Sequence, residues 1–231
     1  MPIHKYFVQE NARRSEIDEF LSQDLKRAGY SKVEMTKTPL GTRVVVYAAK
    51  PGLVIGRRGE SIRDLTQVLE QRFGVQNPQI SVATLEAPEL DAKVVASQIA
   101  MALQRGIHFR RAAYWALQRT IEAGALGVEI VIRGKLSTDR ARYEKYKAGY
   151  LPSVGEAISK LVRFAVVDTQ LKQGLFGIRV RLMPPNVSLP DKPTIRDVPT
   201  QPAQPKPAAA QEAAEAGEVK EVAEPAHTEE A

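Results

Sequence analysis

The chain has 231 residues, contains no cysteine, and carries 33 Lys and Arg residues against 27 Asp and Glu residues. Its length allows one large domain or two small ones, each with its own core. The lack of cysteine excludes disulfides, thiolate zinc sites and cysteine nucleophiles. The three histidines, His4, His108 and His227, are too far apart in the sequence for metal-ligand spacing.

Charge is distributed unevenly along the chain. Residues 201–231 contain two lysines and seven glutamates, a net charge of −5, so the preceding residues hold a net charge of +11. This surplus favours a polyanionic partner, because Lys and Arg displace counterions from phosphates; a soluble protein of high pI is the plainer alternative. With no signal-peptide core and no run of about 18 apolar residues, we expect a soluble, cytoplasmic protein without a membrane partner.

Residues 15–85 predict a first unit of alternating helices and strands. Ser15, with Asp18 three residues later, is a plausible helix N-cap, and Gly29 is a natural end for that helix. The Pro51-Gly52 pair is expected to end a strand. The expected elements are a helix at 15–28, strands at 31–37 and 43–49, a helix at 59–73 and a strand at 79–85, after an N-terminal extension at 1–14.

Residues 88–183 predict a second unit of helices and strands. Pro88 is expected to begin a helix that ends near Gln104, and Ser153 with Glu156 predicts a capping box. The basic and aromatic segment 138–150 shows no clear pattern. The expected elements are helices at 88–104, 108–123 and from 153, and strands at 128–133, 161–171 and 176–183.

The end of the chain has a different composition. Residues 184–207 contain eight prolines, and residues from 208 onward are rich in Ala and Glu. With so few large apolar residues, burial cannot offset the entropy lost on ordering. We therefore expect a disordered tail over 186–231.

The segment Gly56-Arg57-Arg58-Gly59 is the clearest sign of RNA binding. We expect it between an apolar strand and an amphipathic helix, with Ile55 anchoring it to the core. Its glycines allow a phosphodiester chain to approach closely, and the first amides of the helix attract anions. Its arginines add forked donors for phosphate oxygens. A GxxG pattern alone is more often a structural turn, but this context favours RNA.

The order of elements over 15–85, with VIGRRG between strand and helix, resembles a type II KH domain. Residues 109–136 and 171–185 resemble the second domain of the ribosomal protein S-three family of the small subunit. GKLSTDRARYEKY at 134–146 and the ending at 171–185 resemble its archaeal and eukaryotic branch more than its bacterial one, and the short length without a basic extension favours an archaeal origin. The resemblance covers roughly residues 1–185 and implies an α/β (α+β) fold. The expected division is an extension at 1–14, a KH domain at 15–86, a connecting helix at 87–106, a mixed α/β domain at 107–185 and the tail at 186–231.

The resemblance also implies a function. Family members are structural constituents of the small subunit that bind rRNA in its head, line the mRNA entry channel and contact neighbouring head proteins. Basic residues on one helix are implicated in holding and unwinding mRNA, and the matching helix here carries Arg110 and Arg111. Tyr114 stands where the bacterial motif has a third basic residue, which puts the bacterial form of unwinding in doubt. Amphipathicity alone predicts a solvated face with Glu partners.

Segment 140–147 interleaves basic and aromatic residues, a pattern typical of RNA contact surfaces. Tyr143 and Tyr146 stand between its cations. Trp115 is expected in the core or at an interface rather than as a platform for bases. The residues predicted to bind RNA are Ile55, Gly56, Arg57, Arg58, Gly59, Arg63, Arg110, Arg111, Tyr114, Arg140, Arg142, Lys145 and Lys147.

Two other functions fit parts of the sequence. A free-standing KH chaperone or RNA-processing cofactor would explain residues 15–86, but the second domain is not a further KH repeat. An enzyme would need paired carboxylates, a metal site or a nucleophile–base pair, and no such constellation is recognisable. A lone lysine such as Lys135 could form a Schiff base, but no feature marks it. We therefore expect no catalytic residue, metal, cofactor or small-molecule substrate.

Overall fold

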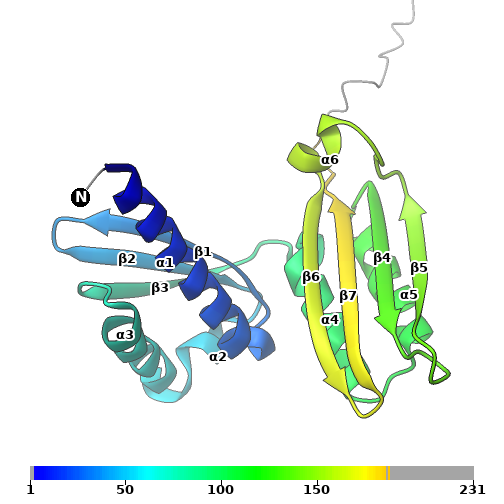
Figure 1. Cartoon of the computed structure of the whole chain (residues 1–231), viewed down its shortest axis with the longest axis horizontal. Coiled ribbons are helices and arrows are strands. Elements are labelled where there is room, and N and C mark those ends of the chain that lie inside the picture. The colour runs from blue at the N-terminus through cyan, green and yellow to red at the C-terminus, as the bar shows by residue number, and fades with distance from the viewer. Residues whose placement is uncertain (1–2, 186, 188–231) are drawn as a thin grey trace, which may run out of the picture. The chain divides into compact units, whose positions relative to one another are not determined.

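The computed structural model describes residues 3–185 and residue 187, so the tail expected at 186–231 lies, apart from position 187, outside the described residues. The described residues form two β-sheets with associated helices (Figure 1). The predicted class, two successive mixed α/β units, is confirmed. The first sheet contains, in spatial order, β1 (Tyr30–Thr38), β2 (Gly41–Ala48) and β3 (Pro78–Thr84). The second contains β5 (Arg142–Gly149), β4 (Gly127–Gly134), β7 (Gly174–Met183) and β6 (Arg163–Leu171).

Helix α1 (Ile3–Asp24) begins well before the expected start at Ser15. Ser15 lies inside the helix because no glycine or proline interrupts this stretch, and an existing helix extends more easily than a new one nucleates. The β1–β2 hairpin also holds the first turns. Lys37 Nζ lies 2.8 Å from Glu10 Oε1 and donates to the Tyr6 hydroxyl at 3.0 Å. Residues 3–14 are therefore part of the helix and not a separate extension.

The first sheet contains the three strands expected at 31–37, 43–49 and 79–85. Strands β1 and β2 pair antiparallel across a turn, and β2 pairs parallel with β3. Helix α1, a 3₁₀ turn (Leu25–Ala28) and helix α3 (Glu60–Phe73) supply the rest of the core. The side chains buried in this core include Ile17, Leu21, Val44, Val46, Leu65 and Leu69.

A short helix, α2 (Pro51–Ile55), stands where the sequence predicts the end of an apolar strand. Pro51 occupies its first turn, where a fixed φ suits a helix and the missing N–H costs no hydrogen bond. Five residues are too few to reveal a helical period in the sequence. The loop at 56–59 therefore joins two helices.

Two helices, α4 (Ala92–Gln104) and α5 (Phe109–Glu122), cover one face of the second sheet (Figure 1). The helix expected to begin at Pro88 begins only after Asp91, which caps α4 by accepting a hydrogen bond from the Lys93 backbone N–H at 3.0 Å. The proline opens a separate 3₁₀ turn instead. The side chains buried beneath the helices include Ile99, Ala113, Ile130, Ile178, Val180 and Leu182.

The segment at 138–150 shows no clear sequence pattern, and in the structure most of it forms strand β5. Helix α6 (Glu156–Leu161) follows it, but its N-cap is Gly155, so the capping box expected from Ser153 does not form. The φ of 83° at this cap is left-handed, which glycine adopts at little cost. Strands β6 and β7, both expected from the sequence, then pair with each other antiparallel.

Candidate nucleic-acid interface

The loop at 56–59 has a backbone that favours its two glycines. Gly56 has a φ of 73°, and a Cβ added there would clash with the Ser61 side chain. Gly59 has a φ of 76° but open space where its Cβ would be. Arg58 between them is also left-handed, with a φ of 53°. Gly56 is therefore needed for both conformation and space, and Gly59 for conformation alone.

The loop brings positive charge to the N-terminus of α3. Gly59 is the N-cap, and no side chain caps the helix there. The Glu60 backbone N–H donates to the Arg57 carbonyl oxygen, so the hydrogen-bonding capacity for an anion lies in the amide groups that follow Glu60. The side chains of Arg57 and Arg58 are exposed, and so is Arg63 in the first part of the helix. Amides, helix dipole and guanidinium groups together suit phosphate oxygens, although Glu60 in the first turn offsets part of the positive charge.

The residue that anchors the loop is Val54, and the expectation for Ile55 is wrong. Val54 is fully buried, whereas Ile55 is 41% exposed. The two residues lie in a helix, where neighbours point about 100° apart, so the position closest to the glycine is not the one facing the core. Ile55 instead presents apolar surface directly beside the basic loop.

Arg110, in the first turn of α5, is tied to strand β5. Its Nε and Nη2 donate to the two carboxylate oxygens of Glu144 at 3.2 and 3.1 Å, while 63% of the Arg110 side chain stays exposed. The hydrogen bond between the groups lowers the pKa of Glu144 and raises the pKa of Arg110. A glutamate partner therefore exists, as amphipathicity predicts, but it comes from β5 and not from the helix itself.

Two tyrosines extend this contact. The Tyr146 hydroxyl donates to Glu144 Oε2 at 2.6 Å, and burial together with this hydrogen bond raises the pKa of Tyr146. Tyr114 on α5 is 61% exposed, and its ring meets the Tyr146 ring edge-on with centroids 5.2 Å apart. The edge contact orients the Tyr114 ring and leaves ring surface for stacking.

Arg111 and Trp115 lie on the exposed side of α5. Within residues 3–185 and 187, no acidic side chain forms an ion pair with Arg111. Trp115 is 48% exposed and lies under the Arg119 guanidinium, 5.2 Å from the ring centroid. Of the two places expected for Trp115, the core is therefore excluded and an interface remains.

The basic segment at 140–147 does not form one patch, because strand β5 alternates its side chains. Glu144 and Tyr146 face α5, as their contacts with that helix show. Neighbouring residues in a strand point to opposite faces. Lys145 accordingly lies on the other side of the sheet, where its Nζ is 2.8 Å from Glu129 Oε2.

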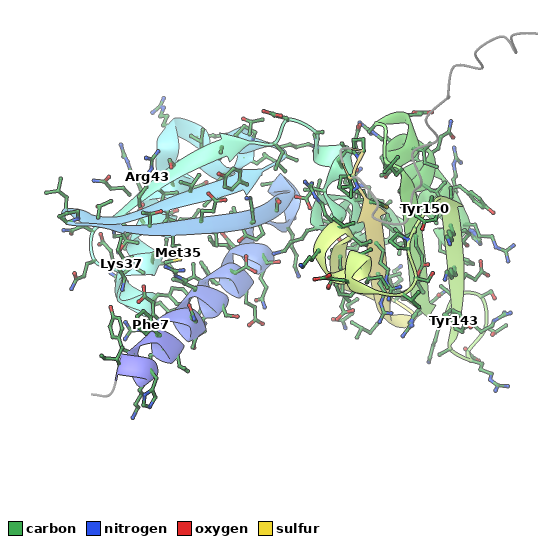
Figure 2. All side chains as sticks on the ribbon, turned by 90° about the horizontal axis from the view of Figure 1, so that it is seen from above. Phe7, Met35, Lys37, Arg43, Tyr143 and Tyr150 are labelled. Atoms are coloured by element: carbon green, nitrogen blue, oxygen red, sulfur yellow. The ribbon has the colours of Figure 1, made fainter. Side chains whose placement is uncertain are left out.

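The four predicted cations of this segment therefore fall into separate sets. Lys145 and Lys147 lie on the face away from α5, together with Tyr143, which Figure 2 shows on β5. Arg142 has the α5-side parity, and Arg140 precedes the strand. The alternation in RYEKYKAG is the sequence signal that separates these sets, and it also identifies Glu144 as a residue facing α5.

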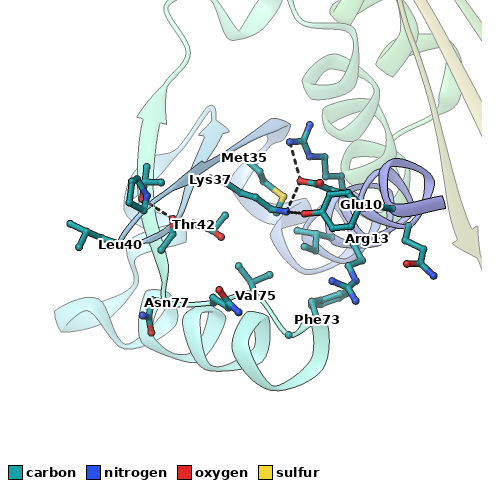
Figure 3. A pocket seen from close by; sticks show the side chains of 18 residues that line it. Glu10, Arg13, Met35, Lys37, Leu40, Thr42, Phe73, Val75 and Asn77 are labelled. Carbon is teal, nitrogen blue, oxygen red and sulfur yellow. Dashed lines mark hydrogen bonds and ion pairs between the residues drawn. The ribbon is translucent and has the colours of Figure 1, made fainter. Parts of the chain in front are cut away.

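A cleft of 610 Å³ lies in the first unit, between α1, the β1–β2 hairpin and the end of α3 (Figure 3). It holds the Glu10 carboxylate, whose pKa the Lys37 hydrogen bond lowers and which Arg14 approaches at 3.7 Å. None of the residues at 56–59 lines this cleft. Among the described residues there is no cluster of potential metal ligands, and none of their helices has the length and apolar character to cross a membrane.

Two family models match the chain in the expected order. The model of the KH domain matches residues 16–90, and the model described as Ribosomal protein S3, C-terminal domain matches residues 99–182.

The chain is similar to several archaeal proteins that are named small ribosomal subunit protein uS3. The protein of Methanocaldococcus jannaschii is 47% identical over 195 residues, covering 84% of this chain and 94% of that protein. The protein of Methanococcus aeolicus is 45% identical over 199 residues, covering 86% and 96%. The protein of Saccharolobus solfataricus is 43% identical over 198 residues, covering 86% of each.

Proposed function

Because the chain belongs to the ribosomal protein S3 family, in its archaeal-type branch, we propose that it binds rRNA in the head of the small subunit and contributes to the mRNA entry channel. Its general role is that of a structural constituent of the small ribosomal subunit. The further partners proposed are neighbouring head proteins in the cytoplasmic subunit. The observation that carries the RNA-binding part is the loop at 56–59.

In this proposal, the loop clamps an RNA backbone. Its left-handed glycines let the phosphodiester chain approach, the uncapped start of α3 attracts phosphate oxygens, and Arg57 and Arg58 add charge-assisted hydrogen bonds. Arg63 extends the positive surface along the helix, and Ile55 offers apolar contact to a sugar or base. KH domains use a GxxG loop in this way.

The exposed side of α5 is the proposed mRNA contact. Arg111 provides a guanidinium without an ion-pair partner among the described residues, and Tyr114 provides a ring oriented by Tyr146. Arg110 has a different role, because Glu144 holds its side chain in place. Four further cations are proposed to contact rRNA from the two sides of β5, namely Arg140, Arg142, Lys145 and Lys147.

The loop proposal is tested by replacing Arg57 and Arg58 with Asp. Binding of a single-stranded RNA oligonucleotide, measured by fluorescence anisotropy at moderate salt, should weaken about tenfold or more. The matched control replaces Lys26 and Arg27 with Asp, since both are exposed cations outside the loop and cause the same change in net charge. Equal affinity losses in the two variants would show that the loop has no special role.

The ribosomal proposal is tested in cells. Sucrose-gradient fractionation of a native lysate should place the chain with small subunits alone, whereas a free pool bound to other RNA would favour a free-standing KH protein. Replacing Arg110 and Arg111 with Ala should slow translation of structured messages more than it slows subunit assembly. An equal effect on structured and unstructured messages would count against contact with incoming mRNA.

A further inference from the structure

Among the residues that the structure describes, helices cover only one face of the second sheet. Helices α4 and α5 pack against β6, β7, β4 and β5 from behind in Figure 1. Within the described residues, the opposite face is covered at one end by a small cluster of Leu151, Val162 and Met183. The rest of this face, here called the open face, is defined by six charged residues. They are Glu129, Arg133, Lys145, Lys147, Arg179 and Arg181.

The strand register places these residues side by side. Lys147 on β5 and Arg181 on β7 both lie opposite Glu129 on the central strand β4. One step along, Lys145 and Arg179 both lie opposite Val131. Because directly opposite residues in antiparallel strands share a face, cations from three strands form adjacent rows on the open face.

A buried carboxylate lies at the centre of these rows. Only 8% of the Glu129 side chain is exposed, and its oxygens lie 2.8 Å from Lys145 Nζ and 3.8 Å from Arg181 Nη1. A buried acid paired in this way satisfies its own charge and holds the two cations in place. Arg133 and Lys147 remain exposed on either side. Asp168 is an exposed acid on this same face, opposite Gly177 in the strand register, but the cations still outnumber the acids, so the open face is positive.

The aromatic residues of the open face lie at its margins. Tyr143 is 70% exposed on the edge strand β5, and Phe164 is 58% exposed on the opposite edge strand β6. The guanidinium of Arg179 lies 5.8 Å from the Phe164 ring centroid and occupies one side of that ring. Bases could therefore stack only at the edges, while the centre offers donors to phosphate oxygens. This arrangement suits the backbone of base-paired RNA better than splayed single strands.

We propose that the open face is a second RNA-binding surface, which contacts the phosphates of base-paired RNA independently of the loop at 56–59. The ligand class rests on the RNA-binding role proposed above, but the surface and three of its cations, Arg133, Arg179 and Arg181, are separate from the residues in that proposal. An acidic protein would also complement the charge, and the experiment below distinguishes the two partners.

The test replaces Arg133, Lys147 and Arg179 with Gln in the full-length protein and leaves the Glu129 ion pairs intact. The probe is an RNA duplex of about 20 base pairs, long enough to span several phosphates on each strand. Its affinity should fall about tenfold or more, and the slope of log affinity against log salt should fall by about 2 to 3, because each lost phosphate contact contributes about 0.9. Circular dichroism verifies that the variant folds; should it not fold, Lys147→Gln alone should lower the slope by about 1.

The matched control replaces Lys26, Arg27 and Arg105 with Gln, which removes the same charge from exposed positions outside the open face. Equal losses of duplex affinity in both triple variants would overturn the proposal, because net charge alone would explain them. Unchanged duplex affinity combined with loss of the chain from small subunits would assign the open face to a protein partner and also overturn it.

The loop variants separate this proposal from the previous one. Aspartates at Arg57 and Arg58 should weaken single-strand binding and leave the duplex salt slope nearly unchanged. If the loop variants have no effect but the open-face variants reduce the slope, only the loop proposal fails. If the loop variants act as expected and the open-face variants match their control, only the open-face proposal fails.

Discussion

The loop at 56–59 and the first turn of α5 each place two adjacent arginines at the start of a helix, yet they present them differently. Before α3, Arg58 and the two flanking glycines have a left-handed φ, whereas Arg57 does not, and no side chain caps the helix. On α5, His108 caps the helix, its Nδ1 accepting from the Arg110 backbone N–H at 3.4 Å. The Arg110 side chain is then fixed by its contact with β5.

Under the function proposed above, this difference would separate two kinds of RNA contact. At the loop, arginine side chains and the backbone amides after Glu60 are both available, so the proposed contact depends on the shape of the backbone and tolerates any RNA sequence. On α5, the cap uses one of the first amides, so contact must come from side chains whose positions are set by packing. We infer that the loop depends most on its glycines, and α5 most on Arg111, which has no ion-pair partner within residues 3–185 and 187.

The largest expected effect is that of Gly56→Ala compared with Gly59→Ala. Both changes force alanine into a left-handed φ, which costs roughly 1 to 2 kcal/mol. Only the Cβ at position 56 would also clash with Ser61, so Gly56→Ala should destabilise the fold by about 2 to 4 kcal/mol in all. Urea denaturation checks the difference, and single-strand RNA affinity should fall in the same order. Similar free energies of unfolding for both variants would mean that the close approach to Ser61 is unimportant.

A smaller effect is expected from separating the two arginines of α5. Arg111→Ala should weaken RNA binding several-fold and lower the salt slope by about 1, as for loss of one phosphate contact. Arg110→Ala should lower the slope by less, because Glu144 already neutralises that guanidinium. Fluorescence anisotropy over a range of salt concentrations measures both slopes. A larger slope change for Arg110→Ala would mean that RNA displaces Glu144 and that the ion pair is not kept on binding.

The sequence predicts the exposed residues of α5 but not the difference between its arginines. Helical periodicity is local and places Arg110, Arg111 and Tyr114 on one side, as the structure shows. The partner of Arg110 is 34 residues further along the chain, so it becomes identifiable only when the strand and its register are known. Contacts that join distant segments leave no period within either of them.

The same limit explains the errors around the loop. The GxxG pattern and the helix after it are local features and are found correctly. Val54 and Ile55 are confused because α2 is too short to show which residue faces the core. Ser15 is wrongly predicted as a cap because the helix begins earlier. The contact between Glu10 and Lys37 helps to hold those earlier turns, and it joins the helix to a hairpin that is distant in the sequence. Both errors concern residues whose surroundings are set by tertiary packing.

The smallest expected effect is the pH dependence of the Arg110–Glu144 ion pair. Arg110 lowers the folded-state pKa of Glu144 below its ordinary value of 4.5, so the pair stabilises the fold above that value and its contribution is lost as pH falls through the lowered pKa. Glu144→Gln lacks this contribution. The difference in urea midpoint between wild type and Glu144→Gln should therefore be present near pH 7 and shrink below about pH 4. Salt should reduce it too, because the pair is exposed.

Glu70→Gln, which removes an exposed acid from α3, is the matched control and should not reproduce this pattern. A midpoint difference for Glu144→Gln that stays constant from about pH 7 to pH 3 would show that the carboxylate charge is unimportant.

If the pattern holds, Glu144→Gln also leaves both arginines of α5 without an acidic partner among the described residues, as both arginines of the loop already are. With its guanidinium released, Arg110 should contribute to RNA binding as Arg111 does, so Arg110→Ala in the Glu144→Gln background should lower the salt slope by about 1 as well. The difference between the loop and α5 would then lie in the helix cap and the left-handed backbone alone.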